Sequence, residues 1–143
     1  MSFLQSLNIS GSGLTAQRLR MDVISENMAN IDATRTENGG PYRRKMVVFT
    51  AADNFKNMMI KNLSEYEAGG VEVAEIVEDL SEFKIMYNPE HPDADENGYV
   101  SMPNVDSLKE TVDMMEAYRA YQANITALNT MKQMALKALE IGR

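Results

Sequence analysis

The sequence contains no cysteine, no tryptophan and one histidine, and these shortages exclude several kinds of chemistry. Without cysteine the chain can form no disulfide, thiolate nucleophile or sulfur-ligated metal site. One histidine, His91, is too few for a zinc site of the HExxH kind. The phosphate-binding pattern GxxxxGKS/T, the dinucleotide pattern GxGxxG and the nucleophile pattern GxSxG are also absent. We therefore expect no catalytic residues, no cofactor and no metal.

Long hydrophobic runs are missing as well. No stretch approaches the roughly 18 consecutive apolar residues of a membrane span, so we expect none. The first residues, MSFLQSLNISGSG, have neither the positive region nor the long apolar region of a secretory signal, and we expect no cleaved signal peptide. The net charge of −7 argues against a nucleic-acid partner, which would favour a basic surface.

The acidic charge lies almost entirely in the middle of the 143-residue chain. Residues 1–31 carry two basic and two acidic side chains, and residues 107–143 carry five basic and four acidic ones. Residues 32–106 hold seven basic and fifteen acidic groups. Nearly neutral ends suit close packing against other chains, because a desolvated charge needs a partner. A chance balance of charge in two ordinary helices would give the same pattern.

The N-terminal residues repeat apolar side chains at the spacing of a coiled coil. Steps of four and three residues reach Phe3, Leu7, Ser10, Leu14, Gln17, Met21, Ile24, Met28 and Ile31. Seven of these nine positions are apolar, and a 3.5-residue repeat is typical of a coiled-coil seam. The periodicity leaves open a single amphipathic helix lying on its own domain's core.

The C-terminal residues predict a second long helix, because residues 107–141 contain neither glycine nor proline. Ser107 and Glu110 have the spacing of a capping box at its start. One face carries Thr111, Met114, Tyr118, Tyr121, Ile125, Leu128, Lys132, Ala135 and Leu139. A second apolar stripe, Met131, Met134, Ala138 and Ile141, begins towards the C-terminus. Two stripes indicate neighbours on two sides of the helix.

The middle of the chain predicts strands at residues 42–49, 71–77 and 83–87, and either a short helix or an exposed loop at 53–65. The basic cluster Arg43-Arg44-Lys45 lies in this acidic segment, and we expect carboxylates to pair with it. The predicted fold is mainly α with a small β insert, its long terminal helices pairing as a coiled coil. Residues 1–33 and 105–143 form one discontinuous helical domain, and residues 34–104 form a β-rich acidic segment.

Residues 93–98 match the first half of a calcium-binding EF-hand loop. The twelfth position should be a bidentate glutamate but is Asn104, and Pro89 and Pro92 prevent an entering helix. We interpret this segment as a polar turn that binds no calcium, and His91 as a surface residue.

Several segments together resemble one protein family. Residues 10–36, SGSGLTAQRLRMDVISENMANIDATRT, resemble the signature helix of bacterial flagellar rod and hook proteins. Ser25, Asn27, Ala29 and Asn30 fall on the motif of that family. PYRRKMVVF, NGYVSMPNVD and EAYRAYQANITALNTMKQMALKALEIG are similar to segments of its proximal-rod members.

The resemblance implies a non-enzymatic subunit of the proximal rod, the drive shaft that crosses the periplasm and transmits motor torque. Its terminal helices would form the inner wall, and its partners would be copies of itself, other rod proteins and the flagellar type III export apparatus. The expected assembly interface comprises Phe3, Leu7, Leu14, Met21, Ile24, Met28, Ile31, Met114, Tyr118, Tyr121, Ile125, Leu128, Met131, Met134 and Leu139. A soluble helical binding module or export chaperone is the alternative, and the β insert counts against it.

Overall fold

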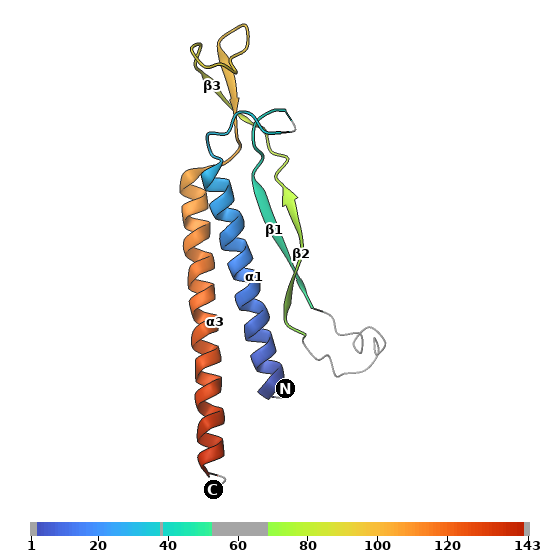
Figure 1. The fold of residues 1–143 in the computed structure, drawn as a ribbon, viewed down its shortest axis with the longest axis vertical. Coiled ribbons are helices and arrows are strands. Elements are labelled where there is room, and N and C mark those ends of the chain that lie inside the picture. Colours follow the sequence, from blue (N-terminus) through green and yellow to red (C-terminus); the bar gives the residue numbers. More distant parts are fainter. Residues whose placement is uncertain (1–2, 38, 53–68, 142–143) are drawn as a thin grey trace, which may run out of the picture.

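The computed structural model describes residues 3–37, 39–52 and 69–141. Two long antiparallel helices lie side by side, a β-ribbon lies along one of them, and a second hairpin projects beyond one end (Figure 1). Both termini lie at the opposite end from that hairpin. In chain order the elements are α1 (Phe3–Ala29), β1 (Lys45–Ala51), β2 (Val71–Glu78), β3 (Lys84–Tyr87), β4 (Tyr99–Met102) and α3 (Ser107–Ile141). This arrangement confirms the predicted fold class.

The start of α3 is capped by Asp106. Its Oδ1 atom accepts hydrogen bonds from the backbone N–H groups of Leu108, at 2.9 Å, and Lys109, at 3.4 Å. The predicted capping box between Ser107 and Glu110 is wrong, because the Glu110 side chain turns into the protein interior and is fully buried. An aspartate one residue earlier satisfies the free N–H groups equally well, which leaves Glu110 for another role.

The strands form two separate antiparallel pairs. β1 pairs with β2 from Lys45↔Glu78 to Ala51↔Val71, with an irregularity between Val48 and Phe49. β3 pairs with β4 from Lys84↔Met102 to Tyr87↔Tyr99, and the two tyrosine rings meet edge to face with centroids 5.3 Å apart.

Three of the four strands match the prediction, within three residues at their starts. β4 was not predicted, because four residues between a turn and Pro103 carry too little alternation to be recognised. The segment 53–65, predicted as a short helix or loop, lies outside the described residues.

Apolar burial within the chain is sparse. The buried apolar residues among those described are Ala16, Val23, Ile24, Tyr42, Val100, Val105 and Ala117. Most of them lie near the end of the helix pair where the chain crosses into β1 and out of β4. In the described residues, no helix has the length and apolar character to cross a bilayer.

Candidate assembly interface

A buried polar cluster joins α1, α3 and the start of β1. It consists of Asn27, Tyr42, Arg44 and Glu110, and we call it the junction. Asn27 and Glu110 are both 0% exposed. The Asn27 Nδ2 atom donates to Glu110 Oε2 at 3.0 Å and to the Lys45 carbonyl at 2.9 Å, and its Oδ1 atom accepts from the Lys45 N–H at 2.9 Å. One side chain thus holds both helices and the first strand.

Arg44 supplies the positive charge of the junction. Its Nε atom donates to Glu110 Oε1 at 2.6 Å, and its Nη2 atom donates to Asp113 Oδ2 at 2.9 Å. A third carboxylate, that of Asp79, lies 4.0 Å from Nη1. Because a buried charge is costly without partners, this surrounding of carboxylates is what allows Arg44 to be buried. Arg44 and Lys45, which binds Glu26 at 2.6 Å, confirm the expected pairing with carboxylates, whereas Arg43 donates to the Asp79 carbonyl at 3.3 Å and lies over the Phe83 ring.

Tyr42 completes the junction as a neutral donor. Its hydroxyl group donates to Asn27 Oδ1 at 3.0 Å. Burial, followed by the negative charges of Glu26, Glu110 and Glu78, raises the pKa of Tyr42 to about 12. The hydroxyl therefore stays protonated at physiological pH, as its role as a donor requires.

Asn104 connects the junction to the second hairpin. Its Oδ1 atom accepts from the Arg44 N–H at 2.8 Å, and its Nδ2 atom donates to the Asp79 carbonyl at 2.9 Å. Both oxygens of Glu110 and both polar atoms of the Asn27 side chain are also bonded. The junction is therefore suited to fixing the geometry of three elements rather than to reacting with a substrate.

Small residues line much of the contact between the helices. Ser10 and Ala16 of α1 and Ala117 of α3 are buried. A Cβ atom added to Gly13 would lie 3.0 Å from Nδ2 of the Asn124 side chain, so the absence of a side chain at Gly13 leaves room for Asn124. Small residues thus share the buried part of the helix pair with the larger Val23 and Ile24.

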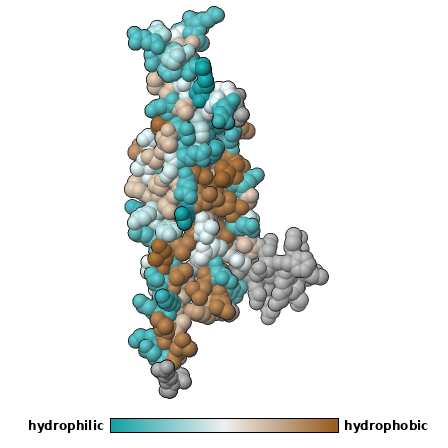
Figure 2. Space-filling view, in the orientation of Figure 1, coloured by the Kyte–Doolittle hydropathy of each residue, from teal (hydrophilic) through white to brown (hydrophobic). Residues whose placement is uncertain are grey.

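The predicted interface residues divide into three groups by exposure. Ile24 is buried. Nine are partly buried, namely Leu7, Leu14, Met21, Ile31, Met114, Tyr121, Ile125, Leu128 and Met131. Five are 39–72% exposed, namely Phe3, Met28, Tyr118, Met134 and Leu139. The sequence analysis missed five further exposed apolar residues on the helices, Leu4, Leu108, Val112, Met115 and Leu136. Figure 2 shows hydrophobic residues gathered along the lower part of the helix pair and over the β1–β2 ribbon.

The four residues of the family motif have different surroundings. Asn27 is buried in the junction, and the Asn30 side chain donates to the Glu26 carbonyl at 2.8 Å near the end of α1. Ser25 and Ala29 are exposed. The sequence did not show that Asn27 meets Glu110, because the two residues are 83 positions apart. The place of Asn27 in the family motif was the signal that marked it, without its partner.

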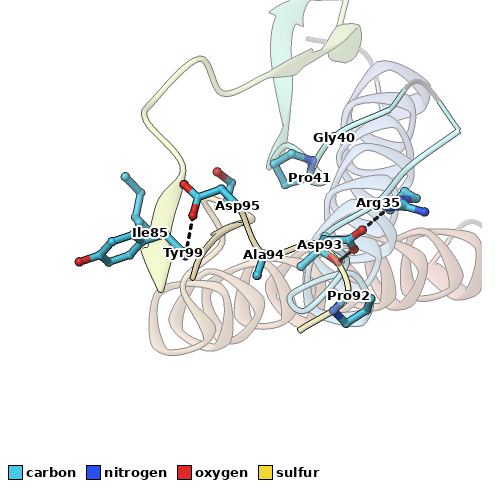
Figure 3. A pocket seen from close by; sticks show the side chains of 11 residues that line it. Arg35, Gly40, Pro41, Ile85, Pro92, Asp93, Ala94, Asp95 and Tyr99 are labelled. Atoms are coloured by element: carbon cyan, nitrogen blue, oxygen red, sulfur yellow. Dashed lines mark hydrogen bonds and ion pairs between the residues drawn. The ribbon is translucent and has the colours of Figure 1, made fainter. Parts of the chain in front are cut away.

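The candidate calcium loop borders an open groove of about 780 Å³ between the β3–β4 hairpin and residues 34–41 (Figure 3). Asp93 pairs with Arg35 and accepts from the Thr34 hydroxyl at 2.8 Å, and these contacts, that of Thr34 foremost, lower its pKa. The Asp95 Oδ1 atom accepts from the N–H groups of Asn97 and Tyr99. The structure therefore supports a hydrogen-bonded turn. No cluster of three or more His, Cys, Asp or Glu in the described ranges could hold a metal.

Family comparisons match both ends of the chain. Residues 7–35 match the family described as "Flagella basal body rod protein". Residues 96–141 match "Flagellar basal body rod FlgEFG protein C-terminal". The two matches cover α1 with the loop after it, and β4 with α3.

Three relatives named "Flagellar basal-body rod protein FlgC" align along their full or nearly full length. The protein from Bacillus subtilis is 50% identical and covers all of both chains. That from Borreliella burgdorferi is 46% identical over 99% of this chain and 98% of its own. That from Salmonella typhimurium is 43% identical over all of both chains. Paired terminal helices, a small β middle and end-to-end similarity agree, and this chain belongs to the FlgC family of flagellar basal-body rod proteins.

Proposed function

We propose that this chain is a structural, non-catalytic subunit of the flagellar rod, and that it polymerises through its terminal helices. The observation that carries the proposal is the exposure of large apolar side chains on both helices of the pair. Five predicted interface residues and five additional apolar residues of α1 and α3 are exposed in the single chain. Covering such surfaces would stabilise an assembly by about 25 cal/mol per Å² of apolar area buried.

The proposed division of the chain follows from the same geometry. Residues 1–33 and 105–143 would pack against neighbouring subunits as the inner wall of a tube, with the acidic segment 34–104 outside them. The junction supports this division, since it fixes the β1–β2 ribbon against α1 through Asn27. The named relatives are basal-body rod proteins, and we place this chain in the part of the rod that crosses the periplasm. Its proposed partners are copies of itself, other rod proteins and the type III export apparatus.

Deletion and complementation in the source bacterium test the proposal. Cells lacking the chain should be non-motile, and an epitope-tagged copy should restore swimming and be found in purified basal bodies. The tagged chain should also leave the cytoplasm without shortening at its N-terminus, as mass spectrometry of basal bodies would show. Restored swimming with the chain confined to the cytoplasm would contradict a rod role and support an export chaperone.

A further inference from the structure

Two partly exposed surfaces of the described structure lie on different sides of α1. The first is the distal face of α3, which we define as Lys132, Leu136 and Leu139. The second is the ribbon face, which we define as Met46, Val48, Glu75 and Val77. Each combines apolar side chains with a charge, and the two charges are opposite.

The distal face lies where α3 runs past the start of α1. Asn27 bonds Glu110, and Gly13 lies beside Asn124. The two contacts are fourteen positions apart on each helix, so the same register between the helices holds over this length. Phe3 is therefore level with about Met134, and the last turns of α3 continue beyond it, as Figure 1 shows. Lys132, Leu136 and Leu139 follow the i, i+4, i+7 spacing of one helix face. The two leucines are 53% and 72% exposed.

The ribbon face follows from the strand register. Met46 lies opposite Val77, and Val48 lies opposite Glu75, so these four side chains share one side of the ribbon. Val48 and Glu75 are exposed, and Met46 and Val77 are partly buried. An isolated two-stranded ribbon is only marginally stable in water, so this ribbon depends on α1, and a partner covering its exposed side chains would stabilise it further.

The two surfaces complement each other in charge. From Ala117 to Ile141, α3 carries three basic residues, Arg119, Lys132 and Lys137, and one carboxylate, that of Glu140. β2 carries three carboxylates and no basic residue. Lys132 lies beside two leucines, and Glu75 lies beside two valines. A contact that buries the apolar side chains would thus place Lys132 next to Glu75, so that neither charge is buried without a partner.

The two surfaces cannot meet within one chain, because α1 lies between α3 and the ribbon (Figure 1). α1 packs against α3, β1 and β2, whereas α3 packs against neither strand. We propose that the distal face of α3 docks on the ribbon face of a second copy of this chain. Such a contact between two different surfaces leaves each surface free on one end of a dimer for a further copy, so it repeats along a helical assembly unless its rotation closes a ring. The inference rests on the proposed rod function and adds the surfaces that join successive copies.

Cysteine trapping tests the contact directly, because the natural chain has no cysteine. The full-length chain carrying both Leu136→Cys and Val48→Cys should form dimers and longer multimers when purified basal bodies are oxidised and run without reductant. Each single variant should stay monomeric, since a contact between different surfaces does not bring identical residues together. The matched control pairs Val48→Cys with Leu108→Cys, which is exposed at the other end of α3 and should give no multimers.

Four results overturn the proposal: monomers from the double variant, dimers from a single variant, equal trapping in the control pair, and trapping only to a different rod protein. A separate result would refute the proposed rod function. If the wild-type chain is absent from basal bodies, the proposed function is wrong, whereas a double variant that enters basal bodies without trapping refutes the docking alone.

A charge exchange tests the same contact without cysteine. Lys132→Glu should reduce swimming-zone diameter and the amount of chain in basal bodies, and adding Glu75→Lys should restore both in part. Lys137→Glu is the matched control, because it makes the same charge change about 140° around the helix. A full effect of the control, or no rescue by Glu75→Lys after a loss caused by Lys132→Glu, would contradict the pairing. Unchanged swimming with Lys132→Glu would contradict it as well.

Discussion

Asn27 and Glu110 lie 83 positions apart in the sequence and share a buried hydrogen bond of 3.0 Å. The same asparagine side chain also bonds the N–H and the carbonyl of Lys45. Pairing of the two helices and attachment of the β1–β2 ribbon therefore depend on one side chain. A change at either residue should disturb both relationships together.

We predict that Glu110→Ala destabilises the chain by about 3–5 kcal/mol, because it leaves the buried Arg44 without its closest carboxylate. The measurement is urea unfolding followed by circular dichroism. Glu116→Ala is the matched control, since Glu116 lies on the same helix and is exposed. Equal unfolding midpoints for the two variants would show that the junction contributes little to stability.

Stability should fall at alkaline pH because of Tyr42. The pKa of this group is raised from 10.0 to about 12 in the folded chain, so its contribution is fully present below pH 10.0 and is lost as pH rises towards 12. Tyr42→Phe should lower stability by about 1 kcal/mol at neutral pH through the lost hydrogen bond. The variant should then lose less stability than the wild type between pH 10 and 12. Parallel pH profiles of the urea midpoint would refute this assignment.

Amide exchange in the dilute monomer should be graded along the helices. Residues 20–29 and 110–117 surround the junction and should exchange slowly. The last turns of α3 run past the start of α1 with mostly exposed side chains and should exchange fast, because little burial offsets their backbone entropy. Uniform protection along both helices would mean that the monomer needs no neighbours to order its ends.

The chain should bind no calcium more tightly than about 10⁻⁴ M, the range of weak extracellular sites. Asp93 already accepts a hydrogen bond from Thr34, Asp95 accepts one from Asn97 within the turn, and Asn104 at the twelfth position bonds Arg44 and Asp79. Isothermal titration calorimetry of the full chain measures this, and Asp95→Asn is the control variant. Binding that is tighter than the limit and lost in the control would show that the turn opens to form a site.

The sequence predicted the second helix, because residues 107–141 contain neither glycine nor proline, and the first through its apolar repeat, which persists despite Gly11 and Gly13. It did not predict which side of each helix the chain covers by itself. Apolar spacing identified residues such as Tyr118 and Met134 as suited to burial, but both remain exposed in the single chain. The helices meet through Gly13, Ala16 and Ala117, whose small size carries almost no signal in a hydrophobic pattern.

The contacts of the junction could not be predicted from the sequence for a different reason. Ser107 and Glu110 have the spacing of a capping box, and only the folded chain shows that Asp106 caps the helix instead. Arg44 was expected to find carboxylates, but their identity depends on Glu110 and Asp113 lying opposite β1 in space. Pairings between residues this far apart follow from packing rather than from local pattern.

The central claim, that the uncovered apolar sides of the helices form the assembly interface, is tested most directly by Tyr118→Asp. Tyr118 is 52% exposed, so the single chain should fold and be exported normally. An unpaired carboxylate in a subunit contact should instead prevent incorporation. Leu80→Asp is the control, because Leu80 is 84% exposed between β2 and β3. The measurement is an immunoblot of the chain in purified basal bodies. We predict that Tyr118→Asp is missing and Leu80→Asp is present at wild-type level, and normal incorporation of Tyr118→Asp would contradict the account.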